Sequence, residues 1–312
     1  MGAAPGKVIL FGEHAVVHGK PAIAAALSHG LGAIVSSRSE GQARLHIPRW
    51  GRTGLLVDAG REEEMKSDAI ARAFLKALDL LEIPPSSSID VTMDGELPLG
   101  VGLGSSAAFS VSLLRALAHF KKMTVSDSEL GTLAFELESI FHGNPSGIDH
   151  SVIIHNECVR FVAKCPLEFR SIKLAVTLPL VVAWTPRHGT TKDAVRHVAG
   201  LQRRRPDLTA RIFDLIESIV EQSVDCLAQG HLSQLGDLMN FNHGALSALG
   251  VVSAENEEMV SIARDAGALG AKVTGAGFGG AMIALAPGRG EEVQSALREK
   301  GFPALLNHIN NH

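Results

Sequence analysis

The feature that most constrains this chain is a glycine-rich loop that runs directly into a long apolar segment. The loop reads PLGVGLGSSAA over residues 98–108, and apolar residues continue to Phe120. Glycines permit positive φ angles and a close approach of the backbone to a ligand. A helix that begins at such a loop points its free N–H groups and the positive end of its dipole toward the loop. The pattern predicts a helix from about Ser105, and it suits either a phosphate site or a simple helix cap at Ser105.

A second glycine-rich loop, TGAGFGG over residues 274–280, matches the GxGxxG pattern literally. A dinucleotide site requires a strand before this pattern and a helix after it. Here the strand-like run Ala281–Leu285 follows, and then Pro287. A nicotinamide site is therefore disfavoured, and the segment predicts a strand, a loop pressed against a ligand or another backbone, and a second strand.

The spacing of apolar residues predicts the other elements and an α+β fold in two lobes, which we place at residues 1–172 and 173–312. Strands dominate the first half of the chain and helices the second. We expect strands at Lys7–Phe11, Ala22–Leu27, Gly32–Ser37, Ile89–Met93, Ser151–Ile154, Val159–Phe161 and Leu174–Trp184, helices at Asp68–Leu81, Asp127–His142 and Glu291–Lys300, and a mostly helical stretch from Thr191 to Ala266.

Charge and composition exclude several classes of protein. The 312 residues include 29 Lys and Arg against 33 Asp and Glu, a net charge of −4, which does not suit a nucleic-acid-binding protein. No apolar run approaches the roughly 18–20 residues that cross a membrane, and no basic leader of a signal peptide is present. The three cysteines, Cys158, Cys165 and Cys226, form no CxxC pair and suit buried thiols in a reducing cytoplasm.

Several polar residues have an ordinary interpretation beside a functional one. Glu138 lies at the edge of a predicted apolar stripe, where a carboxylate either reaches water or is paired or metal-bound. Asp149 ends the turn PSGID, which suits a turn cap as well as a reactive carboxylate. Lys7 and Lys192 could be surface ammonium groups. His14 and His18 have near-ligand spacing but lack the HExxH order, so zinc is disfavoured.

Three segments in order resemble the three motifs of the GHMP kinases. They are PGKVILFGEHAVVHGKPAIA at residues 5–24, PLGVGLGSSAA at 98–108 and KVTGAGFGG at 272–280. The stretches GEHAVVHGKPA, HGNPSGID (142–149) and FNHGALSALGVVS (241–253) resemble the branch of this family that phosphorylates mevalonate. The resemblance covers residues 5 to about 285. One departure is Phe278, which interrupts a run of four glycines that is usual in this branch.

The resemblance implies an N-terminal lobe like the second domain of ribosomal protein S5 and a ferredoxin-like C-terminal lobe. It implies ATP-dependent phosphorylation of the 5-hydroxyl of mevalonate, with Mg²⁺ as cofactor, in the cytoplasm. It implies no binding to nucleic acid or membrane. A homodimer is possible, since some relatives form dimers. It implies that Asp149 is the base for the acceptor hydroxyl, with Lys7 beside it, and that Ser106 and Glu138 hold magnesium. The nucleotide would be bound by Pro98, Gly100, Gly102, Leu103, Gly104, Ser105, Ser106 and Ala107, and the acceptor by Glu13, His14, His18, Thr191, Gly275, Ala276 and Gly277.

Two alternatives accompany this interpretation. One is a kinase of the same family with another small hydroxylated acceptor, since Phe278 could reshape the third motif. An arginine that some members place two residues before Thr191 is replaced by Gly189, and Arg187 could take its role. The other alternative is a protein of the same fold that binds nucleotide or sugar and regulates without catalysis. Such proteins tend to lose catalytic residues, whereas Lys7, Ser106, Glu138 and Asp149 are all present here.

Overall fold

The computed structural model describes residues 1–56, 67–143, 145–163, 168–186 and 189–310, and it forms two compact units. Asn144, Cys165 and Arg187, which the sequence analysis considered, lie outside the described residues. The units interleave along the chain. Unit 1 contains residues 1–6, 29–99 and 104–156, and unit 2 contains residues 7–28, 100–103 and 157–312. The division at residues 172 and 173 stays a prediction.

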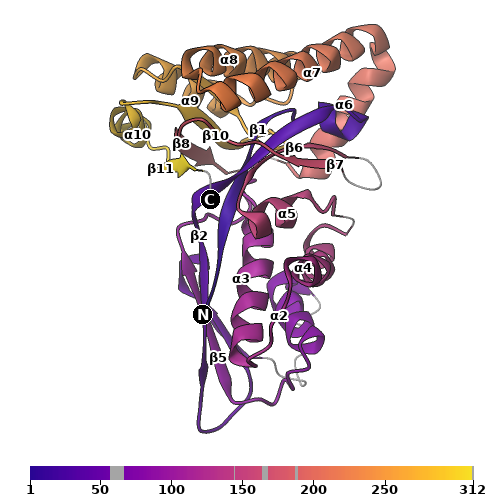
Figure 1. Cartoon of the computed structure of the whole chain (residues 1–312), viewed down its shortest axis with the longest axis vertical. Coiled ribbons are helices and arrows are strands. Elements are labelled where there is room, and N and C mark those ends of the chain that lie inside the picture. Colours follow the sequence, from indigo (N-terminus) through magenta and orange to yellow (C-terminus); the bar gives the residue numbers. More distant parts are fainter. Residues whose placement is uncertain (57–66, 144, 164–167, 187–188, 311–312) are drawn as a thin grey trace. The chain divides into compact units, whose positions relative to one another are not determined.

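Unit 1 is a small sheet covered by helices. The long strand β2 (Pro21–Ser37) enters this unit at His29 and pairs antiparallel with β5 (Ile89–Gly95), in a register that runs from Leu31 opposite Gly95 to Ser37 opposite Ile89. β3 (Arg44–Ile47) is parallel to β5 and antiparallel to β4 (Arg52–Leu56). The helices α2 (Ala69–Leu80), α3 (Ser105–Phe120) and α4 (Asp127–His142) pack against one another beside these strands (Figure 1). The short helix η2 (Pro48–Trp50) joins β3 to β4.

The helices of unit 1 follow from local sequence signals. α4 begins at a capping box in which Ser126 and Glu129 bond each other's backbone N–H groups. Leu130, Ala134 and Leu137 form its buried face. α3 is an exception to one-sided burial, because most of its residues are buried, as expected for the central helix of a layer.

The strand predicted at Ser151–Ile154 is wrong, because this segment is helical. It belongs to α5 (Ile148–His155), which packs against α3 and α4. The β-branched residues Val152, Ile153 and Ile154 favour a strand by propensity, but all three are buried by this packing. Tertiary burial of the apolar side chains therefore outweighs the local preference.

Unit 2 contains a four-stranded antiparallel sheet in the order β11-β8-β10-β9. Its strands are β8 (Leu178–Thr185), β9 (Gly270–Val273), β10 (Gly280–Leu285) and β11 (Ala304–Ile309). Helices α9 (Ala254–Asp265) and α10 (Gly290–Glu299) pack on it around an apolar core that includes Val181, Met259 and Met282. α7 (Pro206–Gln229) and α8 (Leu232–Ala248) run alongside each other (Figure 1), and α6 (Thr191–Arg204) packs against α7.

Unit 2 also receives the first motif. β1 (Gly2–Phe11) pairs with β2 and leads into the one-turn helix η1 (Ala15–His18). The first residues of β2 pair antiparallel with β6 (Cys158–Val162), which pairs with β7 (Glu168–Ser171). The two strands predicted at Ala22–Leu27 and Gly32–Ser37 are thus one continuous strand, and the strand predicted from Leu174 begins only at Leu178. Within the described residues, no helix is long and apolar enough to cross a membrane.

Candidate functional site

The second motif ends in a helix N-terminus suited to an anion. Gly104 is the N-cap residue of α3 and has a φ of 73°, a left-handed conformation that glycine adopts readily. Ser105 is therefore the first residue of the helix, not its cap. Among the described residues no side-chain hydrogen bond caps this N-terminus, and the positive end of the helix dipole there suits a phosphate. Before this turn, Pro98 is partly exposed and Gly100 is exposed.

Ser106 and Glu138, the predicted magnesium ligands, contact each other in unit 1. The Ser106 hydroxyl on α3 donates to a carboxylate oxygen of Glu138 on α4 over 3.3 Å, and it lies 3.0 Å from Nε2 of His142. The second oxygen of Glu138 accepts from Ser110 over 3.3 Å. The Glu138 side chain is only 2% exposed. A nearly buried carboxylate is costly unless it is paired or coordinates a cation.

This pair fits the donor set that magnesium prefers. A serine hydroxyl and a carboxylate are both hard oxygen ligands, and Mg²⁺ in nucleotide sites uses one or two protein oxygens together with phosphates and water. Among the residues that the structure describes, no group of three or more His, Cys, Asp and Glu could hold a metal. A magnesium ion at Ser106 and Glu138 would therefore need its other ligands from the nucleotide and water.

Asp149 lies in the first turn of α5, where its charge is favourable to the helix dipole. The preceding Gly147 has a φ of 81° and turns the chain into this helix. Asp149 is partly exposed in unit 1, and Lys7 is 6% exposed on β1 in unit 2. Lys7 is thus not a surface ammonium group, and its pairing with Asp149 stays a prediction.

Unit 2 joins parts of all three motifs through the backbone. The N–H of Lys7 donates to the carbonyl of Leu103 over 3.0 Å, and the hydroxyl of Thr274 bridges the N–H and the carbonyl of Ile9 at 3.0 and 2.8 Å. A Cβ atom on Gly275 would lie 3.8 Å from the carbonyl oxygen of Gly102. Segments far apart in the sequence therefore meet at the predicted phosphate loop.

The histidines of the first motif are held against the rest of unit 2. Nε2 of His14 donates to the carbonyl of Ala276 over 3.0 Å, which ties the first motif to the third. The ring of His18 stacks on Phe213 with centroids 4.4 Å apart. Burial lowers the pKa of both histidines, so both imidazoles are neutral at pH 7. Because the single N–H of neutral His14 is donated to Ala276, its Nδ1 can only accept a hydrogen bond from a substrate hydroxyl.

Glu13 is directed into the interior of unit 2. Its carboxylate accepts from the ammonium of Lys272 and from the amide of Asn242 over 3.4 Å, and its side chain is 1% exposed. The prediction that Glu13 binds the acceptor stays a prediction, but the observed contacts are those of a residue that fixes its own segment. Sequence reasoning missed both partners, although Lys272 begins the third motif and Asn242 lies in the segment FNHGALSALGVVS.

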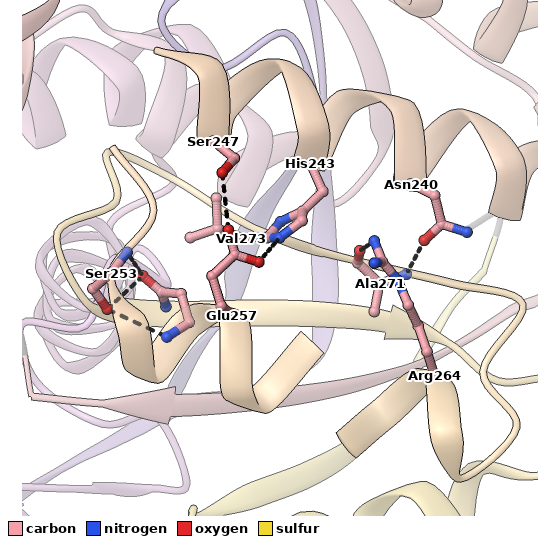
Figure 2. A network of polar contacts seen from close by, with 9 residues as sticks. Asn240, His243, Ser247, Ser253, Glu257, Arg264, Ala271 and Val273 are labelled. Atoms are coloured by element: carbon pink, nitrogen blue, oxygen red, sulfur yellow. Dashed lines mark hydrogen bonds and ion pairs between the residues drawn. The ribbon is translucent and has the colours of Figure 1, made fainter. Parts of the chain in front are cut away.

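A polar network supports β9, the strand that carries Lys272 into the third motif. Figure 2 shows His243 on α8 between the Val273 backbone N–H, which donates to Nδ1, and the carboxylate of Glu257, 2.9 Å from Nε2. Glu257 also accepts from Ser247 over 2.9 Å. Nearer the start of β9, the side chain of Asn240 accepts from the N–H of Ala271 (Figure 2). The strand is therefore bonded along its length to α8.

The predicted acceptor residue Thr191 is the first residue of α6. The helix is capped by Thr190, whose hydroxyl accepts from the Asp193 N–H over 3.1 Å while the Asp193 carboxylate accepts from the Thr190 N–H over 3.0 Å. Thr191 is exposed. The third-motif residues Gly275 and Ala276 are half-buried, and Gly277 is buried because its α-carbon lies against the Val251 carbonyl.

Two family models match the chain. The model for the GHMP kinases N terminal domain covers residues 68–157, and the model for the GHMP kinases C terminal covers residues 223–302. A mevalonate kinase of Pyrococcus horikoshii is 34% identical over 330 residues, which is 99% of this chain and 95% of that protein. A mevalonate kinase of Methanothermobacter thermautotrophicus is 36% identical over 295 residues, 95% of this chain and 93% of that protein.

Solved structures agree with the sequence comparisons. The crystal structure of L. major mevalonate kinase in complex with R-mevalonate matches with a TM-score of 0.85 and 30% identity, over 99% of this chain and 95% of that one. The Methanococcus jannaschii mevalonate kinase matches with a TM-score of 0.83 and 26% identity, over 99% and 97% of the two chains. The predicted two-lobed α+β fold is confirmed.

Proposed function

The chain belongs to the GHMP kinase family, and we propose from this premise that it transfers the γ-phosphoryl group of ATP to the 5-hydroxyl of mevalonate. The products are 5-phosphomevalonate and ADP, and the reaction is a step of isoprenoid synthesis. The observation that carries the proposal is the similarity over nearly the full chain to curated mevalonate kinases, at 34–36% identity. The match to a mevalonate kinase with R-mevalonate bound supports the same acceptor.

The nucleotide phosphates would meet the N-terminus of α3. Phosphoryl transfer needs positioning and neutralisation of charge more than covalent chemistry. The N-terminus of α3 after Gly104 offers the positive end of the helix dipole to the phosphates, and Gly102 and Leu103 directly precede it in the chain. We assign Pro98, Gly100, Gly102, Leu103, Gly104, Ser105, Ser106 and Ala107 to the nucleotide.

We assign magnesium to Ser106 and Glu138, whose oxygens lie 3.3 Å apart. When bound there, the ion would offset the negative charge of the phosphates. The carboxylate of Glu138 is held ready by the hydroxyls of Ser106 and Ser110, so it needs little rearrangement to become a ligand.

Asp149 is the proposed base and Lys7 the proposed cation beside the reacting hydroxyl. The reaction requires two groups from the chain's own residues. One is a carboxylate that accepts the hydroxyl proton, and the other is an ammonium that stabilises the resulting negative charge. His14, His18, Thr191 and Gly275–Gly277 would bind the acceptor. His14 is preorganised for this by its bond to Ala276.

We also propose a cytoplasmic location and a homodimer. The two cysteines in the described residues, Cys158 and Cys226, are buried free thiols, which suits a reducing compartment. Burial raises the pKa of Cys158 to about 12, so this thiol is unreactive. Sedimentation analysis of the purified protein tests the dimer, which a single species with the mass of one chain would exclude.

The experiment that tests the function is an ADP-release assay with magnesium and ATP against mevalonate, phosphomevalonate, galactose and homoserine. We expect strong turnover with mevalonate alone. Turnover with another acceptor and not with mevalonate would retain the kinase chemistry and refute the assigned substrate. Binding of ATP without turnover of any acceptor would favour the regulatory alternative.

A further inference from the structure

Phe278 is a bulky residue in a backbone conformation that belongs to glycine. Its φ is +56°, in the left-handed region, between the glycines of the third motif. A non-glycine residue that is neither Asn nor Asp is uncommon there and is strained. Such strain persists where the surrounding structure over-determines it, and it clusters at functional sites. The nucleotide and acceptor roles assigned above give this phenylalanine no part.

The connection between α8 and α9, together with the first turn of α9, fixes the backbone at Phe278 and Gly279. The Phe278 N–H donates to the carbonyl of Val251 over 2.8 Å, and the Gly279 N–H donates to the Asn256 side chain over 3.2 Å. A Cβ atom on Gly277 would lie 2.2 Å from the Val251 carbonyl oxygen, so the chain cannot shift toward it. The backbone therefore aims the side chain in one direction.

The ring of Phe278 lies against the beginning of α6. A Cβ atom on Gly189 would lie 3.3 Å from Cδ2 of Phe278, closer than an ordinary van der Waals contact. The ring also meets His197 edge-on, with centroids 5.5 Å apart and planes at 72°. His197 is in turn 3.2 Å from the carbonyl of Leu249. One aromatic ring thus contacts both the residue before the cap of α6 and a side chain two turns into it.

Gly189 is a glycine for reasons of space. Its φ lies outside the left-handed region, so its backbone would accept alanine. A Cβ atom at residue 189 would require the Phe278 ring to shift by a few tenths of an ångström. The large residue in the glycine loop and the small residue facing it therefore form a complementary pair within unit 2.

We propose that Phe278 is a positioning residue that fixes the N-terminus of α6, and with it Thr191, against the third-motif loop, and so determines how tightly the acceptor binds. The inference rests on the proposed function for its kinetic consequence. Its structural part, the fixing of α6, does not depend on which molecule is phosphorylated. The ring acts through Thr191 and the loop and need not touch the acceptor.

The first test measures backbone order without substrate. Phe278→Gly removes the ring and also relieves the strained φ, so the fold is not expected to be lost. Hydrogen exchange of the free protein should become about tenfold faster in the first turns of α6 and stay unchanged in α10. Unchanged exchange in α6 would overturn the proposal whatever the enzyme phosphorylates.

The second test is a double-mutant cycle of Phe278→Gly, Gly189→Ala and the double variant. Gly244→Ala is the control, because a Cβ atom there would meet nothing within 4 Å. Phe278→Gly should raise the KM for mevalonate about tenfold and leave the KM for ATP within about twofold. Gly189→Ala should raise the same KM alone but have no further effect in the double variant. Additive effects, or equal changes in both KM values, would overturn the proposal.

Failure of the proposed function and failure of the proposed positioning role give different results. Failure of the wild-type chain to turn over mevalonate refutes the proposed function, while faster exchange of α6 in Phe278→Gly would still support the positioning role. A wild-type chain that turns over mevalonate normally, with a Phe278→Gly variant of unchanged KM and unchanged exchange, refutes only the positioning role.

Discussion

The ammonium of Lys272 donates to the carboxylate of Glu13 in the interior of unit 2, where the two side chains are 0% and 1% exposed. The pair joins β9 to the segment that follows β1, across 259 positions of sequence. Burial raises the pKa of Glu13 and lowers that of Lys272, and their mutual attraction opposes both shifts. Neither charge could be buried there without the other.

We expect Lys272→Met to destabilise the protein by about 3–5 kcal/mol, because it leaves an unpaired carboxylate in the interior. The double variant Lys272→Met with Glu13→Gln should recover most of this loss, since both charges are then removed. Urea unfolding of the wild type and of the variants measures the difference. A double variant no more stable than Lys272→Met would show that the ion pair is not what holds this segment.

We expect Asp149→Asn to bind ATP nearly normally and to lower kcat by about 10²–10⁴, because the amide cannot accept the hydroxyl proton. Asp127→Asn is the matched control, since Asp127 also lies in the first turn of a helix but is exposed. Its kcat should be unchanged. A loss of less than about tenfold in Asp149→Asn would remove Asp149 from the role of base.

We expect Glu138→Gln to raise the magnesium concentration needed for half-maximal rate by about tenfold or more, because a charged ligand is lost. Glu136→Gln on the same helix is the control, as Glu136 is exposed. Titration of the rate with magnesium at fixed ATP measures the effect. An unchanged titration in Glu138→Gln would place the metal elsewhere.

We expect the stability of the wild type to fall as the pH drops below about 6.5, the ordinary pKa of histidine. Burial lowers the pKa of His243, and also of His14, His18 and His150, so the unfolded chain binds protons that the folded chain excludes. The stabilisation is complete above this pH and is lost as the pH falls toward the lower, folded pKa values. Protonation of His243 would also break its bond from the Val273 N–H.

The variant His243→Asn tests the contribution of this residue. The asparagine oxygen can still accept from Val273, but the side chain does not titrate. The stability of the variant should fall less steeply than that of the wild type as the pH drops from 6.5 to 5.5. Urea unfolding at several pH values measures the slope, and equal slopes in the two proteins would contradict the assignment.

Local sequence alone determined most of the helices, the glycine loops and the fold class. The periodicity and the capping box of α4 predict residues 127–142 correctly, because hydrogen bonds and side-chain contacts of a helix join residues three or four apart. The strand–loop–strand form of the third motif is confirmed for the same reason, since the glycines and the flanking apolar runs are contiguous. The motif order was enough to indicate the kinase family.

Only the tertiary structure decided which residues meet. It made a helix of residues 148–155 in spite of their β-branched side chains, because packing against α3 and α4 buries them. It paired Lys272 with Glu13 and set the ring of Phe278 against Gly189. Periodicity reports on neighbours within a few residues, whereas the contacts of Lys272 with Glu13 and of Phe278 with Gly189 join positions 259 and 89 residues apart and depend on the tertiary fold.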